Sequence, residues 1–124
     1  MTVLDASAVL ALLFREPGSD RVAAALPSSC ISSVNLSEVA GRFIRDGAEV
    51  EEVAYRLRQL ALDVVPFDEQ AALRAAALLP VTSPLGLSLA DRACLALARQ
   101  RGLTALTTDR AWASVPGVNV ELIR

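Results

Sequence analysis

The chain has 124 residues, of which 53% are hydrophobic and 21% charged, and its formal net charge at pH 7 is −2. A chain of this length buries roughly two-thirds of its unfolded surface, so residues 1–124 can form one domain without staples. All basic residues are arginine, and histidine and lysine are absent. This excludes Ser–His and Cys–His nucleophiles, histidine-ligated zinc and a P-loop lysine. Acid–base and metal chemistry would therefore depend on carboxylates, and the net charge does not indicate a nucleic-acid binder.

The sequence carries no sign of a membrane or secreted protein. No apolar run reaches the roughly 18–20 residues that a membrane span needs. The early apolar stretch Ala8–Phe14 has no basic region before it, so we expect no secretory signal. Cys30 and Cys94 lie in apolar segments and are interpreted as small buried hydrophobes, not as a structural disulfide. We expect a cytoplasmic protein.

The first third of the chain alternates strand and helix. Thr2–Leu4 is typical of a short strand, and an apolar helix is predicted at Ser7–Phe14. Glu16–Gly18 breaks this helix. A second helix is predicted at Ser19–Leu26, followed by a strand at Cys30–Ser32.

The middle of the chain is mainly helical. Apolar residues at helical spacing predict a helix over Asn35–Asp46, which Gly47 closes. A further helix at Val50–Leu62 leads into a strand at Asp63–Val65. An alanine-rich helix then runs over Asp68–Leu79, with its first residue as the cap.

The last third begins with the longest predicted loop, Pro80–Leu87. A helix at Ser88–Arg101 follows, then a strand at Ala105–Thr107, a helical turn at Arg110–Ala113 and a strand at Val118–Leu122. Strands that alternate with helices predict an α/β fold with a mainly parallel sheet flanked by helices. Such sheets bind ligands beyond the carboxyl ends of their strands.

Four acidic residues belong to that edge of the predicted sheet. Asp5 directly follows the first strand, and Asp109 directly follows the fourth. Glu38 lies near the start of the helix after the second strand, and Asp91 lies in the first turn of the helix before the fourth. We therefore expect the four carboxylates to lie close together.

Each acid taken singly also fits an ordinary structural role. Asp5 and Asp109 could be N-caps of the helices that they precede. Ser88–Asp91 has the spacing of a capping box, and Asn35–Glu38 resembles one. Glu38 could also pair with Arg42 four residues on, which would contribute a few tenths of a kcal/mol.

The surroundings favour a shared role for the four acids. Asp5 and Asp91 begin helices that are apolar on nearly every face, and such helices are buried. A desolvated carboxylate is costly unless it is paired or binds a metal. No lysine is available, and we expect Arg92 and Arg110 to point outward. A divalent cation would resolve the repulsion, and oxygen-only ligands indicate Mg²⁺ or Mn²⁺, the ions of phosphodiester hydrolysis.

Four segments of the chain resemble the acidic blocks of PIN domains, in the order in which that family carries them. They are Val3–Ala8, Val34–Val39, Gly86–Ala98 and Leu106–Trp112. The similarity is greatest to the VapC-type toxins of bacterial toxin–antitoxin pairs and spans almost the whole chain. It implies a five-stranded parallel sheet and an Mg²⁺- or Mn²⁺-dependent endoribonuclease.

The resemblance also implies which residues act and what the chain binds. The acids that match the family's metal-binding positions are Asp5, Glu38, Asp91 and Asp109. Ser7 and Thr107 match small polar positions that could hydrogen-bond the acids, although a cap and a strand hydroxyl explain them equally well. The implied partners are an RNA substrate, a cognate antitoxin and a second copy of the chain, for which Gly41 could permit a close contact. Apart from the resemblance, Arg15, Arg42, Arg45, Arg92 and Arg110 could meet phosphates. Long arginine side chains are usually only solvated, so none of them is included in the predicted site.

Other functions stay open at this point. A PIN-like scaffold without catalysis, or a PIN nuclease of RNA processing that is not a toxin, would carry the same acids. A phosphatase of the Asp-x-Asp type is a poor fit because Ser7 stands where the second Asp would be needed. A phosphotransfer receiver domain lacks its lysine.

Overall fold

A computed structural model describes all residues, 1–124, as a five-stranded sheet covered by helices. All strand pairings are parallel, and the order across the sheet is β3-β2-β1-β4-β5. The strands are β1 Thr2–Leu4, β2 Ser29–Ser32, β3 Asp63–Val65, β4 Thr104–Thr107 and β5 Asn119–Leu122. The predicted α/β fold and its five strands are confirmed.

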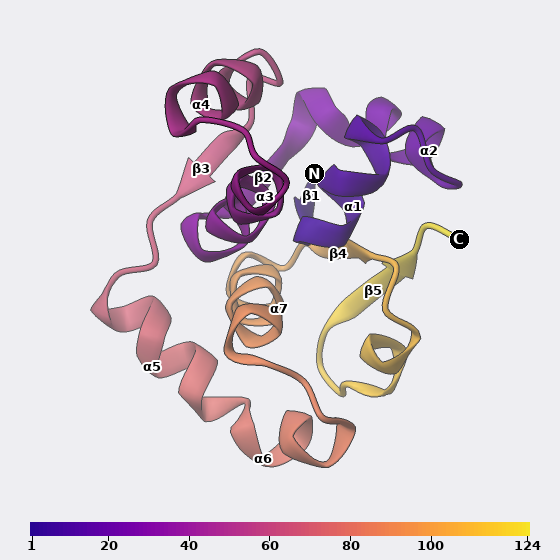
Figure 1. Ribbon diagram of the computed structural model, residues 1–124. Helices are drawn as coiled ribbons and strands as arrows, with labels where there is room; N and C mark the ends of the chain where they lie inside the picture. Colours follow the sequence, from indigo (N-terminus) through magenta and orange to yellow (C-terminus); the bar gives the residue numbers. More distant parts are fainter.

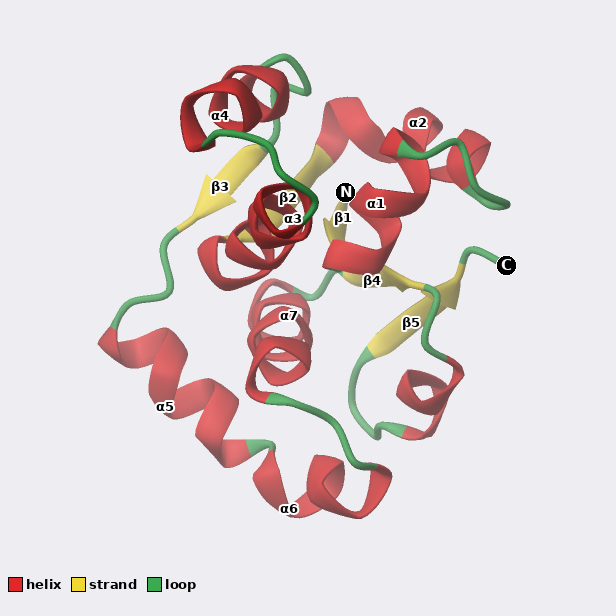
Figure 2. Cartoon of the chain, viewed as in Figure 1, coloured by secondary structure: helices red, strands yellow, loops and turns green.

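Helices connect successive strands and lie on both faces of the sheet. The helices are α1 Ala6–Leu13, α2 Ser19–Ala25, α3 Ser33–Arg45, α4 Val50–Arg58, α5 Glu69–Ala77, α6 Leu79–Thr82 and α7 Leu89–Arg101. In Figure 1, α2 and α4 lie toward the top of the view, α5 and α6 lie at the bottom, and the strands run between them. Figure 2 shows that the connections are short. None of the helices is long and apolar enough to cross a membrane.

Successive side chains of the central strands point to opposite faces of the sheet and pack into two separate hydrophobic cores. Val3, Cys30 and Ala105 are aligned neighbours on β1, β2 and β4 and pack into a cluster with α5 and α7. The next residue of each strand points to the opposite face, as the pleat requires. Leu4 and Leu106, which are also paired, therefore pack with α1, α2 and α3.

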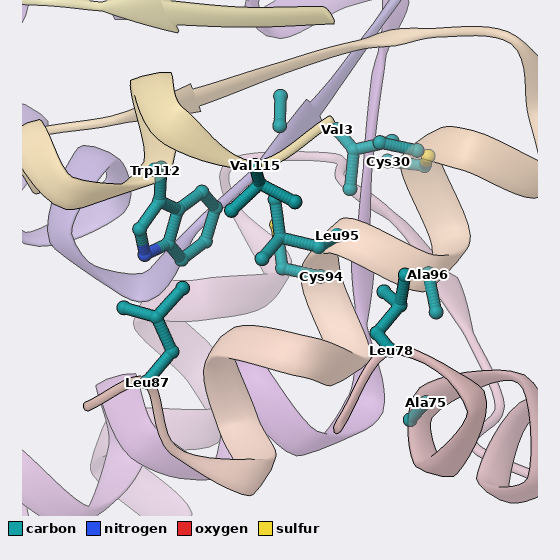
Figure 3. Packing of buried hydrophobic residues seen from close by; sticks show 12 residues of the cluster. Val3, Cys30, Ala75, Leu78, Leu87, Cys94, Leu95, Ala96, Trp112 and Val115 are labelled. Carbon is teal, nitrogen blue, oxygen red and sulfur yellow. The ribbon is translucent and has the colours of Figure 1, made fainter. Parts of the chain in front are cut away.

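The cluster under α7 holds the one tryptophan of the chain. Trp112, in a 3-10 helix at Arg110–Ser114, is fully buried. Figure 3 shows its ring beside Leu87 and Val115. Cys30 and Cys94 lie in the same cluster as buried free thiols, so their interpretation as small hydrophobes is confirmed. Burial raises the pKa of both thiols, most strongly that of Cys94.

The predicted loop Pro80–Leu87 is wrong in its first part. Residues Leu79–Thr82 form α6, and Ser83–Leu85 form a 3-10 turn. Each has a proline at its N-terminus, where the missing N–H costs no hydrogen bond. Another predicted boundary also shifts: α4 ends at Arg58, before Leu62, because Ala61 takes a left-handed conformation with φ 53°.

Candidate metal and active site

The strand order places one crevice at the carboxyl edge of the sheet. The chain leaves β1 toward β2 and β3 on one side, and β4 then returns on the other side of β1. Ligands of open α/β sheets bind beyond the strand ends at such a reversal. Asp5 directly follows β1, and Asp109 lies two residues after the end of β4. Both acids therefore flank the reversal point.

Asp5 is buried, with an exposed fraction of 6%. It stands at the N-cap position of α1, but its side chain makes no capping hydrogen bond. The hydroxyls of Ser7 and Thr107 both donate to its Oδ2, at 2.7 and 2.9 Å. Its Oδ1 receives no side-chain donor. The cap explanation is therefore wrong for Asp5, and Ser7 and Thr107 contact it as the family pattern implied.

The two hydroxyls are themselves held by the backbone after β4. The N–H of Thr108 donates to Ser7 Oγ at 3.1 Å, and the N–H of Asp109 donates to Thr107 Oγ1 at 3.1 Å. Burial raises the pKa of Asp5, the two hydroxyls lower it, and the charge of Asp91 raises it again. The net effect is a raised pKa. This carboxylate is costly to ionise in the bare protein.

Asp91 and Asp109 serve as caps with one carboxylate oxygen each. Asp91 Oδ2 accepts the N–H of Ser88 at 2.8 Å, and Ser88 Oγ accepts the N–H of Asp91, which makes the predicted capping box. Asp109 Oδ1 accepts the N–H of Ala111 at 3.0 Å. The second oxygen of each carboxylate accepts no hydrogen bond from another side chain. Capping and ligand binding are thus compatible in both residues.

Glu38 is held by Asn35 instead of by Arg42. Asn35 Nδ2 donates to Glu38 Oε1 at 3.1 Å, whereas Arg42 pairs with Asp46. The predicted capping box at Asn35–Glu38 is wrong, because α3 begins at Ser33 and Ser32 is its N-cap. Desolvation raises the pKa of Glu38, the Asn35 bond lowers it, and the charges of Asp5 and Asp91 raise it.

All four acids line one open depression of about 580 Å³. Gly41, Arg42 and Arg45 of α3 also line it, and a Cβ at Gly41 would meet nothing within 4 Å. Sequence reasoning did not select the two arginines, because exposed arginines on a helix are usually only solvated. The two arginines line the depression because α3 lies beside α1.

The arginines expected to point outward behave differently. Arg110 is exposed, as expected. Arg92 is partly buried: its Nη1 donates to the carbonyl of Leu87 at 3.4 Å, and its Nε is buried without a partner. The expectation that Arg92 points outward is wrong, because its guanidinium hydrogen-bonds the backbone of Leu87, just before α7.

Comparison with known families decides the identity of this fold. The sequence profile of the PIN domain matches residues 2–118. The chain belongs to the PIN-domain family. A comparison with curated proteins gives no significant match.

The solved structures that resemble this PIN domain include toxin–antitoxin complexes. One is a toxin–antitoxin complex from Klebsiella pneumoniae, with TM-score 0.77 and 19% identity over 100% of this chain and 98% of that one. Another is DNA-bound VapBC from Salmonella typhimurium, with TM-score 0.75 and 21% identity over 99% and 98%. The fold is also similar to that of FitAcB from Neisseria gonorrhoeae, with TM-score 0.71 and 26% identity over 97% of this chain and 96% of that one.

The donor set of this PIN domain fits a hydrated divalent ion. It consists of oxygen atoms only. The charge of Asp91 raises the pKa of both Asp5 and Glu38, and a divalent cation bound among the three carboxylates would oppose this effect. No three acidic, histidine or cysteine side chains stand close enough to hold one ion directly. Mg²⁺ and Mn²⁺ sites commonly complete their coordination shell with water, so these carboxylates need not all contact the ion directly.

Proposed function

We propose that this PIN domain is an Mg²⁺- or Mn²⁺-dependent endoribonuclease and the toxin component of a type II toxin–antitoxin pair. The observation that carries the proposal is the buried carboxylate of Asp5, which opens with three further acids into one depression at the strand reversal. A buried carboxylate without a cation partner lowers stability. Its retention is explained if it binds a metal ion.

Asp5 and Asp91 are the residues that would hold the ion, with Glu38 and Asp109 holding its waters or a second ion. The ion would lower the pKa of a water molecule and neutralise charge on a phosphodiester, which are the two requirements of metal-assisted hydrolysis. The expected products carry a 5′-phosphate and a 3′-hydroxyl.

The neighbouring side chains have their own tasks in this proposal. Ser7 and Thr107 occupy Oδ2 of Asp5, so the carboxylate keeps one orientation and directs its Oδ1 away from them. Arg42 and Arg45 face the same depression as the acids. Their guanidinium groups can contact phosphates next to the bond that is cut.

The toxin assignment draws support from the solved neighbours, which are toxin–antitoxin complexes. We expect a cognate antitoxin, a cytoplasmic location and a homodimer. An apolar groove of about 430 Å³ between α3 and α4, lined by residues such as Leu36, Ala40 and Leu57, offers apolar surface to the antitoxin.

Cleavage of structured RNAs by the purified protein tests the proposal. We expect cleavage with Mn²⁺ or Mg²⁺, and none with a chelator or in the Asp5→Asn variant. Glu69→Gln, which removes an exposed acid on α5, is the matched control and should keep full activity. A fully active Asp5→Asn protein would overturn the site assignment. Ion binding without cleavage of any RNA would instead favour a scaffold role.

A further inference from the structure

Asn35 is a fully buried polar residue in the first turn of α3. Its Nδ2 donates two hydrogen bonds, to Glu38 Oε1 at 3.1 Å and to the backbone carbonyl of Ala90 at 3.0 Å. Ala90 directly precedes Asp91 in α7. A single amide group therefore joins one acid of the depression to the residue next to another.

This bond crosses between the two layers of the fold. α3 packs with the core on one face of the sheet, through Val39, whereas α7 packs with the core on the other face. The first turns of both helices reach the carboxyl edge, where no strand lies between them (Figure 1). Asn35 is the side chain that hydrogen-bonds α3 to α7 there.

The orientation of the Asn35 amide follows from the two acceptors around its nitrogen. Its Oδ1 is buried and has no hydrogen-bond partner. The reverse amide orientation would satisfy nothing, because it would set the oxygen against two acceptors, Glu38 Oε1 and the Ala90 carbonyl. Asn35 therefore acts through its amide nitrogen, which joins Glu38 to the backbone of α7.

We propose that Asn35 is a positioning residue that sets the place of Glu38 relative to Asp91 and thereby the metal affinity of the depression. The inference rests on the proposed function. Glu38 is otherwise an exposed side chain with several rotatable bonds, and Arg42 does not restrain it. The Asn35 bond holds Oε1 of Glu38, a residue that lines the depression, and Oε2 accepts no hydrogen bond from another side chain. Loss of a residue that orients a metal ligand typically weakens metal affinity about 10- to 100-fold.

Calorimetric titration of the folded protein with Mn²⁺ tests the role of Asn35 without RNA. Asn35→Leu keeps the number and branching of the side-chain heavy atoms but removes both donors, and Asn35→Ala is a second, smaller variant that cannot clash. We expect the Mn²⁺ dissociation constant to rise about tenfold or more in both. The matched control is Thr82→Val, which loses the hydrogen bond of another fully buried residue, on α6, and should bind Mn²⁺ like wild type.

A double-mutant cycle shows whether Asn35 acts through Glu38. Glu38→Gln should weaken Mn²⁺ binding in wild type, and weaken it much less in the Asn35→Leu background. Additive effects, or an unchanged dissociation constant in folded Asn35 variants, would overturn the inference while the proposed function stands. If wild type binds no Mn²⁺, or Glu38→Gln binds it normally, the proposed metal site itself fails, and the role of Asn35 fails with it.

Discussion

At the scale of single residues, the site is built around Asp5. Its two hydroxyl donors, Ser7 and Thr107, come from segments 100 residues apart in the chain. Both donors bind the same oxygen of the carboxylate. The surrounding core removes most of the water that would otherwise stabilise the charge. The bare protein is therefore strained electrostatically at the position where a cation is proposed to bind.

Metal-free Asp5→Asn should be more stable than metal-free wild type at neutral pH, by about 1 kcal/mol. Burial raises the folded-state pKa of Asp5 above its ordinary value of 3.8. The folded protein then binds more protons than the unfolded chain between these two pKa values, so wild-type stability falls as pH rises through that window. The advantage of the variant should thus disappear below pH 3.8.

Urea denaturation in chelator across this pH range measures both free energies of unfolding. The pKa of Glu38 is raised from 4.5, in part by the charge of Asp5, so its contribution has the same sign in both proteins and is larger in wild type. It therefore adds to the advantage of the variant at neutral pH. A variant that is less stable than wild type at neutral pH and equally so in acid would contradict the account.

Thr107→Val tests the contribution of the Thr107 hydroxyl to RNA cleavage, because valine keeps the shape of the side chain and lacks the hydroxyl. The variant loses the hydrogen bond to Asp5 and the acceptor of the Asp109 N–H. We expect RNA cleavage to fall about 10- to 100-fold, in line with other residues that orient metal ligands. Thr104→Val on the same strand is the control and should cleave normally. Equal activities of the two variants would mean that Thr107 is only a strand residue.

The residue scale also shows what the sequence could and could not predict. Asp5 and Asp109 are predictable from the sequence, because Asp5 directly follows β1 and Asp109 lies two residues after the end of β4. The role of Asn35 was not, because its decisive partner, the Ala90 carbonyl, lies 55 residues away. The partly buried position of Arg92 is not predictable from the sequence, because its backbone partner at Leu87 depends on how the segment before α7 folds.

At the scale of elements, the short central strands are held in place by the burial of their apolar side chains in the two cores. Alternation in β1, β2 and β4 was readable from the sequence, since each strand carries apolar residues that face opposite cores. The segment after α5 was less readable, because its prolines indicate a loop as well as helix starts. The position of α3 beside α1, which brings Arg42 to the depression, depends on packing between Phe14 and Phe43, whose rings stack at 5.3 Å.

Gly18→Ala should destabilise the junction between α2 and the end of the chain. Gly18 has φ +96°, and a Cβ there would lie 2.6 Å from the carbonyl oxygen of Ile123. We expect a loss of about 2–3 kcal/mol, measured by urea denaturation. Gly102→Ala, at φ +65° with open space, carries only the backbone cost of about 1 kcal/mol. Equal losses in the two variants would rule out the clash with Ile123.

At the scale of the whole molecule, the strand reversal decides where the acids meet. β1 and β4 are neighbours although they lie about a hundred residues apart in the chain, and that pairing brings Asp5 and Asp109 to one edge. The general rule for α/β sheets predicted this edge. The exact spacing of the acids was not predictable, because it depends on how α3 and α7 dock against one another.

Divalent ions should stabilise the whole fold through this edge. At a hundredfold excess over the dissociation constant, Mn²⁺ should raise the free energy of unfolding of wild type by about 2.7 kcal/mol. Asp5→Asn should show little or none of this increase in parallel denaturation experiments. A similar increase in the variant would place the ion elsewhere.

The most direct test of the central claim is end analysis of RNA incubated with the purified protein and Mn²⁺, with and without chelator. The account predicts metal-dependent cuts within the RNA that leave 5′-phosphate and 3′-hydroxyl ends. Cuts that persist in chelator, or that leave cyclic phosphates, would contradict a metal-assisted hydrolysis at these four carboxylates.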